Sequence, residues 1–145
     1  MSAWADPTEW GWAMGRKGHT QEEDRQTQKP RAFLICPVRG ITDEYADGIR
    51  AQVEMLERGY QVHWPMRDTN QSAGSLQICE QNRAAIQASD VVFIAWDGKS
   101  QGCLFDLGMA FAMGKRVRAI IGYTPAMTIV KSYANFIFEY EQVTA

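Results

Sequence analysis

The sequence predicts an α/β fold in which a parallel five-stranded sheet carries helices on both faces. Short continuous apolar runs such as Ala32–Cys36 and Val91–Trp96 are typical of strands buried on both faces. Between these runs, apolar residues recur at the spacing of an amphipathic helix, and capping or breaking residues bound each segment. Strands that alternate with helices in this way favour a parallel sheet with right-handed crossovers.

Each element follows from its own pattern. The first strand, residues 32–36, ends at Pro37, and the next helix begins after Thr42, a good N-cap residue, and stops at Gly59. The other expected elements are a strand over 60–64, a loop over 65–74, a helix over 76–88, a strand over 91–96, a helix over 102–113, a strand over 117–121, a short helix over 125–132 and a last strand over 136–138.

The strand order that we expect is 2-1-3-4-5, as in flavodoxin-like and other Rossmann-like folds. In that order a ligand crevice opens beyond the carboxyl ends of the first and third strands. The site should therefore be built from the loop after Cys36 and the loop after Trp96.

The chain of 145 residues fits one domain, which we place at residues 31–145. Residues 1–30 show no clear period and read as an irregular arm. The arm carries Trp4, Trp10 and Trp12, and such rings are costly to leave in water. We expect the arm to dock on its own domain or on a partner subunit.

Composition excludes several classes. Fifteen basic and 17 acidic residues give a net charge of −2, which offers no electrostatic attraction to a nucleic-acid polymer. No apolar run is long enough to span a membrane, and no secretory signal opens the chain, so a cytoplasmic location is expected. Cys36, Cys79 and Cys103 read as reduced core thiols. His19 and His63 lie far apart, and the chain has no Cys–X–X–Cys or His–Glu–X–X–His spacing, so a structural zinc site is not expected. No other cofactor is expected.

The loop after the first strand has the residues of an anion site. It comprises Cys36, Pro37, Val38, Arg39 and Gly40. The guanidinium offers a bidentate fork, the glycine lets the backbone approach a ligand, and the next helix points its N-terminus to the same place. The other interpretation is a solvated arginine in a turn.

The loop after the third strand runs into an apolar helix that carries one carboxylate. Ser100 and Gly102 offer a hydroxyl and free backbone N–H groups at the helix N-terminus, a second oxyanion-binding element. Asp106 falls in the expected first turn. It is either an acid that stabilises the helix dipole or a nucleophile or base that points into the crevice.

A third candidate lies on the helix predicted over residues 76–88. Asn82 shares a face with Ile78 and Ala85, so it should be partly buried and must find hydrogen-bond partners. It either holds a ligand or ties down a loop.

Several motifs, in their order and spacing, resemble the nucleoside 2-deoxyribosyltransferase superfamily, nearest to the deoxynucleoside-monophosphate N-glycosidases. The match covers roughly residues 32–122. The motifs are Phe33–Gly40, Glu80–Asn82, Ala88–Val92, Ser100–Gly102, Phe105–Gly108 and Gly114–Val117.

The resemblance implies an enzyme that cleaves or transfers the N-glycosidic bond of a nucleotide or nucleoside. Asp106 takes the place of the nucleophilic Glu of the family, and Asn82 takes the place of a second catalytic Asp. Arg39 and Ser100 resemble the part that holds the 5′-phosphate, and Asp97 could supply a second carboxylate. Family members assemble as dimers or larger rings, in which a neighbour completes the pocket.

Two alternatives stay open. Residues 96–102 also resemble a loop of Rossmann-like nucleotide-sensing domains of the SLOG type, which suggests a non-catalytic binding module. A structural subunit in which these loops only turn corners is the third reading. For any of them we expect a homo-oligomer, most simply a dimer, held by the arm or by Tyr133, Phe136, Phe138 and Tyr140.

Overall fold

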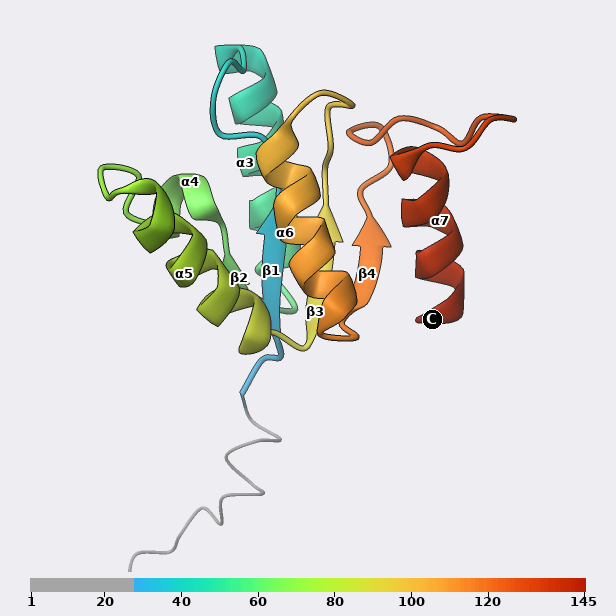
Figure 1. Cartoon of the computed structure of the whole chain (residues 1–145). Coiled ribbons are helices and arrows are strands. Elements are labelled where there is room, and N and C mark those ends of the chain that lie inside the picture. Colours follow the sequence, from blue (N-terminus) through green and yellow to red (C-terminus); the bar gives the residue numbers. More distant parts are fainter. Residues whose placement is uncertain (1–27) are drawn as a thin grey trace, which may run out of the picture.

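The computed structural model describes residues 28–145, which form a single sheet flanked by helices (Figure 1). The predicted alternation of strands and helices is confirmed up to residue 119, with one exception. The loop predicted over residues 65–74 is wrong in its first part, because Pro65 at the first helical position opens the short helix α4 (Pro65–Asp68). In chain order the elements are β1 (Arg31–Ile35), α3 (Asp43–Leu56), β2 (Gln61–His63), α4 (Pro65–Asp68), α5 (Ser75–Gln87), β3 (Val91–Ile94), α6 (Gln101–Ala112), β4 (Arg116–Ala119) and α7 (Tyr133–Val143).

The sheet has four parallel strands in the order β2-β1-β3-β4. The first four positions of the predicted order are therefore correct. Strand β1 pairs with β2 on one side and with β3 on the other, which explains why its residues after Arg31 are buried.

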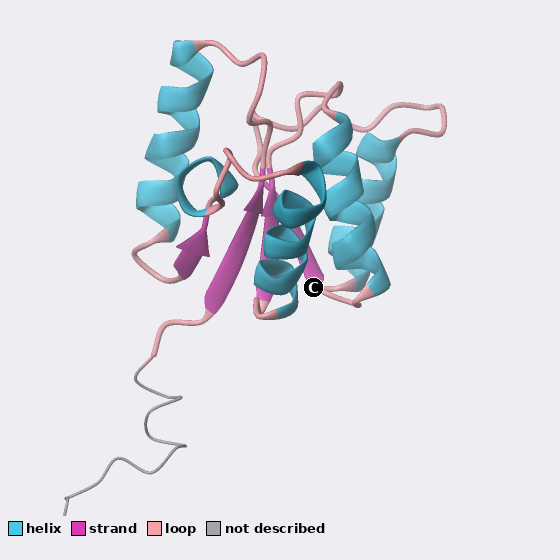
Figure 2. Cartoon of the chain, turned by 60° about the vertical axis from the view of Figure 1, so that its left-hand side comes forward, coloured by secondary structure: helices cyan, strands magenta, loops and turns pink. Residues whose placement is uncertain are grey.

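Alternate side chains of β1 face opposite sides of the sheet, as the strand period of two requires. Ala32 and Leu34 pack in the cluster that α3 covers, together with Ile49. Phe33 and Ile35 belong to the cluster that α5, α6 and α7 cover. Helices thus lie on both faces, and Figure 2 shows the sheet between them.

The prediction of a fifth strand is wrong. Residues 136–138 lie inside α7, and residues 125–132, which were expected to form a short helix, are a loop outside any regular element. The Ser132 hydroxyl caps α7 by accepting from the backbone N–H of Asn135 at 3.0 Å. Ala134 and Ile137, three residues apart, bury one helix face, so the aromatic run follows a helical period and not a strand period.

Helix α7 lies beside β4, where a fifth strand would pair (Figure 1). The Thr144 hydroxyl accepts from the backbone N–H of Val117, and the Arg118 guanidinium donates to the Thr144 carbonyl at 3.0 Å. The Tyr140 hydroxyl donates to the Lys115 carbonyl at 2.8 Å. These contacts cover part of the edge of the sheet, which would otherwise present unpaired backbone groups.

Two helix starts bear on the site. Thr42 caps α3 as predicted, since its hydroxyl accepts from the backbone N–H of Tyr45. Helix α6 begins at Gln101, with Ser100 as its N-cap, and not at Gly102. Asp106 is therefore the sixth helical residue and lies in the second turn. The prediction of a first-turn acid is therefore wrong. Because the helix dipole acts mainly on the first turn, it stabilises Asp106 little.

Some expectations fall outside the described residues. Trp4, Trp10 and Trp12 belong to residues 1–27, so the docking of the arm stays a prediction. Among residues 28–145, no helix has both the length and the apolar character that a membrane span requires.

Candidate active site

A cavity of about 670 Å³ opens beyond the carboxyl ends of β1 and β3, where the strand order places a ligand. Its size is within the range of small-molecule sites. Five segments line it: the two loops after these strands, the segment between β2 and α5 that includes α4, and helices α5 and α6. The lining residues are Cys36, Val38, Arg39, Gly40, Pro65, Gln71, Ser75, Ile78, Cys79, Asn82, Asp97, Lys99, Ser100, Gly102, Cys103, Phe105 and Asp106.

Asp106 projects from α6 into this cavity and is half-buried. Loss of water around the carboxyl group raises the pKa of Asp106 from 3.8 to about 7, and a hydrogen bond from the Asn82 side chain opposes this rise. The carboxyl group is therefore divided between its ionised and protonated forms near neutral pH. A perturbed carboxyl group in a cleft has the character of a functional group rather than a solvated surface acid.

Asn82 projects from α5 and is buried, with 7% of its surface exposed. Its side-chain oxygen accepts a hydrogen bond from the Thr69 hydroxyl at 2.8 Å. Its amide acts on Asp106 from the other side. Asn82 thus holds Thr69 at the end of α4, and it lines the cavity together with Asp106.

The loop after β1 presents a positive charge at the mouth of the cavity. Arg39 is exposed, and within residues 28–145 no carboxylate lies at ion-pair distance from it. Gly40 has a φ of 69°, a left-handed conformation that a side chain disfavours. The glycine lets the chain turn sharply after Arg39, which leaves the guanidinium on the cavity wall.

Asp97 shapes the second loop. One of its carboxylate oxygens accepts from the backbone N–H of Lys99 at 2.9 Å and from that of Ser100 at 2.7 Å. Gly98 has a φ of 80°, and a Cβ there would lie 3.3 Å from Cγ of Pro125. The Asp97 carboxylate is exposed and engaged with its own backbone. Its part in catalysis stays a prediction.

Ser100 and Gly102 stand at the N-terminus of α6. The Ser100 hydroxyl accepts from the backbone N–H of Cys103 over a long 3.4 Å, and its carbonyl accepts from the indole N–H of Trp96 at 3.2 Å. These contacts fix the start of the helix beside the cavity. Helix N-termini attract anions because their first backbone N–H groups lack partners within the helix.

The three cysteines line the same cavity although they lie far apart in sequence. All three are free; Cys36 and Cys103 are buried, as predicted for core thiols, and burial raises the pKa of each to about 12. They remain protonated near neutral pH and are poor nucleophiles. Cys79 differs from the prediction, because it is only half-buried and faces the cavity wall.

The cavity brings together every site residue that the sequence predicts except Pro37, which is fully buried and absent from the lining. Sequence reasoning missed Lys99, Gln71 and Ser75. Lys99 adds a second cation beside Ser100, and its place in the predicted loop could have revealed it. Gln71 gave no signal, because residues 65–74 read only as a connecting loop. Among residues 28–145, no group of three or more His, Cys, Asp or Glu residues could hold a metal ion.

A comparison with models of known protein families finds a match over most of the chain. The model of a family described as nucleoside 2-deoxyribosyltransferase matches residues 33–136, which include every lining residue of the cavity. No curated protein matches the chain at a significant level.

Proposed function

Because the chain belongs to the nucleoside 2-deoxyribosyltransferase family, we propose that it cleaves or transfers the N-glycosidic bond of a nucleoside 5′-monophosphate or nucleoside. The family description supports glycosyl transfer on nucleosides. The observation that carries the finer proposal is the Asp106 carboxyl group. It is half-buried in the cavity, has a raised pKa, and shares the cavity wall with Arg39 and the N-terminus of α6.

In the proposed reaction the ionised Asp106 carboxylate attacks the anomeric carbon of the sugar. The bond from this carbon to the base nitrogen breaks, and the base leaves with the bonding electrons and takes up a proton. The product is a glycosyl ester on Asp106, which water hydrolyses or a second base displaces. Stabilisation of an oxocarbenium-like transition state by a carboxylate is the physics of retaining glycosidases.

Burial supports this role for Asp106. A carboxylate with a pKa of about 7 is more basic than an exposed one and carries fewer ordered water molecules to remove before attack. Asn82 donates a hydrogen bond but cannot donate a proton at neutral pH. The proton that the departing base needs therefore comes from water.

The phosphate preference rests on the charges around the mouth of the cavity. Arg39 and Lys99 bring two cations, and Ser100 and Gly102 bring the N-terminus of a helix. A 5′-phosphate would gain charge-assisted hydrogen bonds that a nucleoside lacks.

The experiment is a screen for free base. The protein is incubated with the common ribo- and deoxyribonucleoside monophosphates and with the nucleosides, and the base is measured by chromatography. A second base added to each reaction distinguishes transfer from hydrolysis. Asp106→Asn is the matched control, because it keeps the shape of the side chain but removes the nucleophile. Undiminished release by Asp106→Asn would remove Asp106 from the mechanism.

A nucleotide-binding module without turnover is the second candidate. Two substitutions favour it: Asp106 stands where the nucleoside 2-deoxyribosyltransferase family has the nucleophilic Glu, and Asn82 stands where the family has a second catalytic Asp. The shorter side chain of Asp106 places its carboxylate farther from a substrate that the family binds, and small misplacements slow catalysis strongly. Tight binding of monophosphates without release of any base would support this candidate.

We also propose a homodimer. The loop before α7 exposes several apolar residues. It lies close to the loop after β3 that lines the cavity, because Pro125 packs against Gly98. Phe136, Phe138 and Tyr140, expected at an interface, are instead half-buried, and Phe136 packs on Phe111 with ring centres 5.0 Å apart. Among the described residues between β4 and the start of α7, the exposed apolar side chains that could form the interface are Ile121, Met127, Ile129, Val130 and Tyr133.

A further inference from the structure

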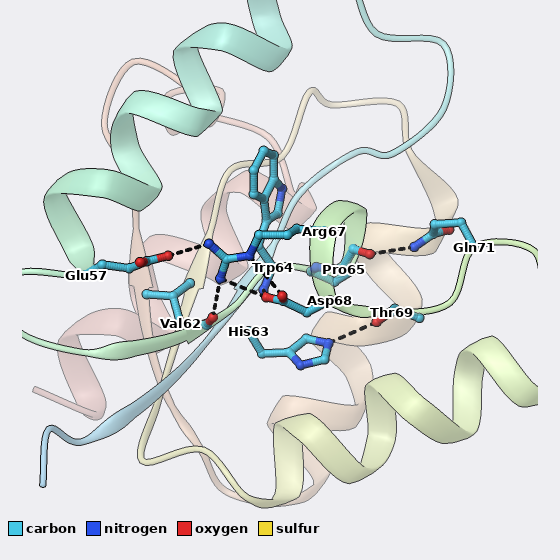
Figure 3. A network of polar contacts seen from close by, with 9 residues as sticks. All are labelled: Glu57, Val62, His63, Trp64, Pro65, Arg67, Asp68, Thr69 and Gln71. Atoms are coloured by element: carbon cyan, nitrogen blue, oxygen red, sulfur yellow. Dashed lines mark hydrogen bonds and ion pairs between the residues drawn. The ribbon is translucent and has the colours of Figure 1, made fainter.

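A chain of hydrogen bonds runs from β2 to Asn82, which lines the same cavity as Asp106. Nε2 of His63 lies 2.9 Å from Oγ1 of Thr69, a contact that Figure 3 shows. The same hydroxyl lies 2.8 Å from Oδ1 of Asn82. Asn82 and Asp106 line the same cavity, and the Asn82 side chain lowers the pKa of Asp106, as a hydrogen-bond donor does. His63 and Thr69 do not line the cavity themselves.

The chemistry of the threonine hydroxyl fixes the direction of this chain. A hydroxyl has one proton, and Thr69 donates it to Oδ1 of Asn82. The contact with His63 must then be a donation from Nε2–H of the imidazole to Oγ1 of Thr69. Because Oδ1 of Asn82 accepts from Thr69, the NH₂ end of the amide is the end left to donate to Asp106.

The two outer members of the chain are held in place. The His63 ring stacks on Phe33 with ring centres 5.3 Å apart and planes at 9°. Thr69 closes α4, and its backbone N–H donates to the Pro65 carbonyl at 3.1 Å. The Gln71 side chain donates to the same carbonyl at 2.8 Å, as Figure 3 shows.

Ionic contacts fix α4 from its other side (Figure 3). Arg67 bonds to Asp68, to Glu57 at 2.6 Å and to the Val62 carbonyl at 2.9 Å. Asp68 in turn accepts from the backbone N–H of Trp64 at 2.8 Å. The segment that carries Thr69 is thus attached to α3 and β2, which limits how far its hydroxyl can move.

We propose that His63 and Thr69 are positioning residues that hold the Asn82 amide with its NH₂ group toward the Asp106 carboxylate. The reverse orientation would set an amide oxygen against a carboxylate, which repels the charged form and leaves both oxygens without a donor. The two residues thereby stabilise the ionised carboxylate. The kinetic part of this inference rests on the proposed function; the structural part does not.

The groups that face Asp106 from the other elements stay the same when Thr69 is changed. The titratable and charged ones are Cys36, Arg39, Cys79, Asp97, Lys99 and Cys103 around the cavity, and Arg31, Arg67 and Asp68 around His63. A change at Thr69 therefore acts on Asp106 through Asn82, because none of these charges is removed.

The test is a titration of the ligand-free protein by NMR, with ¹³C-labelled aspartate carboxyl groups. Thr69→Val keeps the shape of the side chain and removes the hydroxyl, while Thr69→Ser keeps the hydroxyl. We expect the pKa of Asp106 to rise by about one unit in Thr69→Val, since a hydrogen bond to the charged form is weakened. Thr69→Ser should titrate like the wild type. An unchanged pKa in Thr69→Val, or an equal rise in Thr69→Ser, would overturn the proposal.

A second measurement uses the unaltered protein and does not depend on how a variant folds. Above its pKa, which burial lowers, the His63 ring should show its proton on Nε2 in ¹⁵N spectra. The loss of one histidine signal in His63→Gln assigns that signal. A proton on Nδ1 instead would mean that the chain runs in the opposite direction, and the proposal would fail.

The kinetic readout separates this proposal from the proposed function. If the wild type releases base, the acidic limb of its kcat profile should move to higher pH in Thr69→Val by the shift seen in the titration, with KM nearly unchanged. Rescue by Thr69→Ser completes the pattern. If the wild type releases no base, the proposed function fails, and the two NMR measurements still decide the positioning role.

Discussion

Replacing Asp106 with asparagine should make the protein more stable at pH 8 even though it removes the proposed nucleophile. The ionised carboxylate is half-buried in the cavity, and this raises the pKa of Asp106 from 3.8 to about 7. Between these values the folded protein binds the proton more tightly than the unfolded chain does. The free energy of unfolding therefore falls as pH rises through this window and levels off above about pH 7.

The magnitude follows from the size of the shift. A change of about three units corresponds to about 4 kcal/mol at 1.36 kcal/mol per unit, and partial exposure of the carboxyl group reduces it to about 2–4 kcal/mol. Asp106→Asn removes this cost and should be more stable than the wild type by that amount at pH 8. At pH 5 the gain should shrink to less than half, because the native carboxyl group is already protonated there.

Urea unfolding of both proteins at pH 5 and pH 8 measures the difference. Glu80→Gln is the matched control, since Glu80 is an exposed carboxylate on α5 and its loss should change stability little at either pH. A gain in Asp106→Asn that is equal at both pH values, or absent at pH 8, would refute the reasoning.

Two further predictions concern binding and assembly. Arg39→Ala should weaken binding of a monophosphate by about tenfold to a hundredfold and leave nucleoside binding nearly unchanged, because only the monophosphate loses a charge-assisted contact. Calorimetry measures the affinity for both ligands. Equal losses of affinity would place Arg39 outside the site. Light scattering at micromolar concentration should give the mass of a dimer, and Ile129→Asp with Val130→Asp should shift it toward the monomer, since both side chains are exposed apolar surface before α7. A wild-type monomer would contradict the interface.

Most of the fold could be predicted from the sequence, because the local pattern of most elements matches the burial of their side chains in the structure. The apolar run of β1 fits only a buried strand, and Thr42 fits only a helix cap; the structure contains both features. The run Phe136–Phe138 has two readings, because three adjacent apolar residues fit a strand or a buried helix. The Ser132 cap and the burial of Ala134 and Ile137 decide for the helix, and neither is visible in the run itself.

The candidate site was predictable where it depends on strand ends and less so where it depends on side-chain contacts. Cys36 and Asp97 follow neighbouring parallel strands, so topology alone brings their loops together. His63 lies on an edge strand, and Thr69 lies just after α4. Thr69 bonds to Asn82 across 13 residues of sequence and to His63 across 6, and no periodic pattern encodes either hydrogen bond.

The covalent intermediate offers the most direct test of the central claim, that Asp106 attacks the sugar. The protein is mixed with the monophosphate that releases base fastest, quenched in acid within the first turnovers, and digested for mass spectrometry. The account predicts that the peptide containing Asp106 gains the mass of the sugar phosphate less one water, and that Asp106→Asn gains nothing at this position. Release of base with no sugar on that peptide, or with the sugar on another residue, would contradict it.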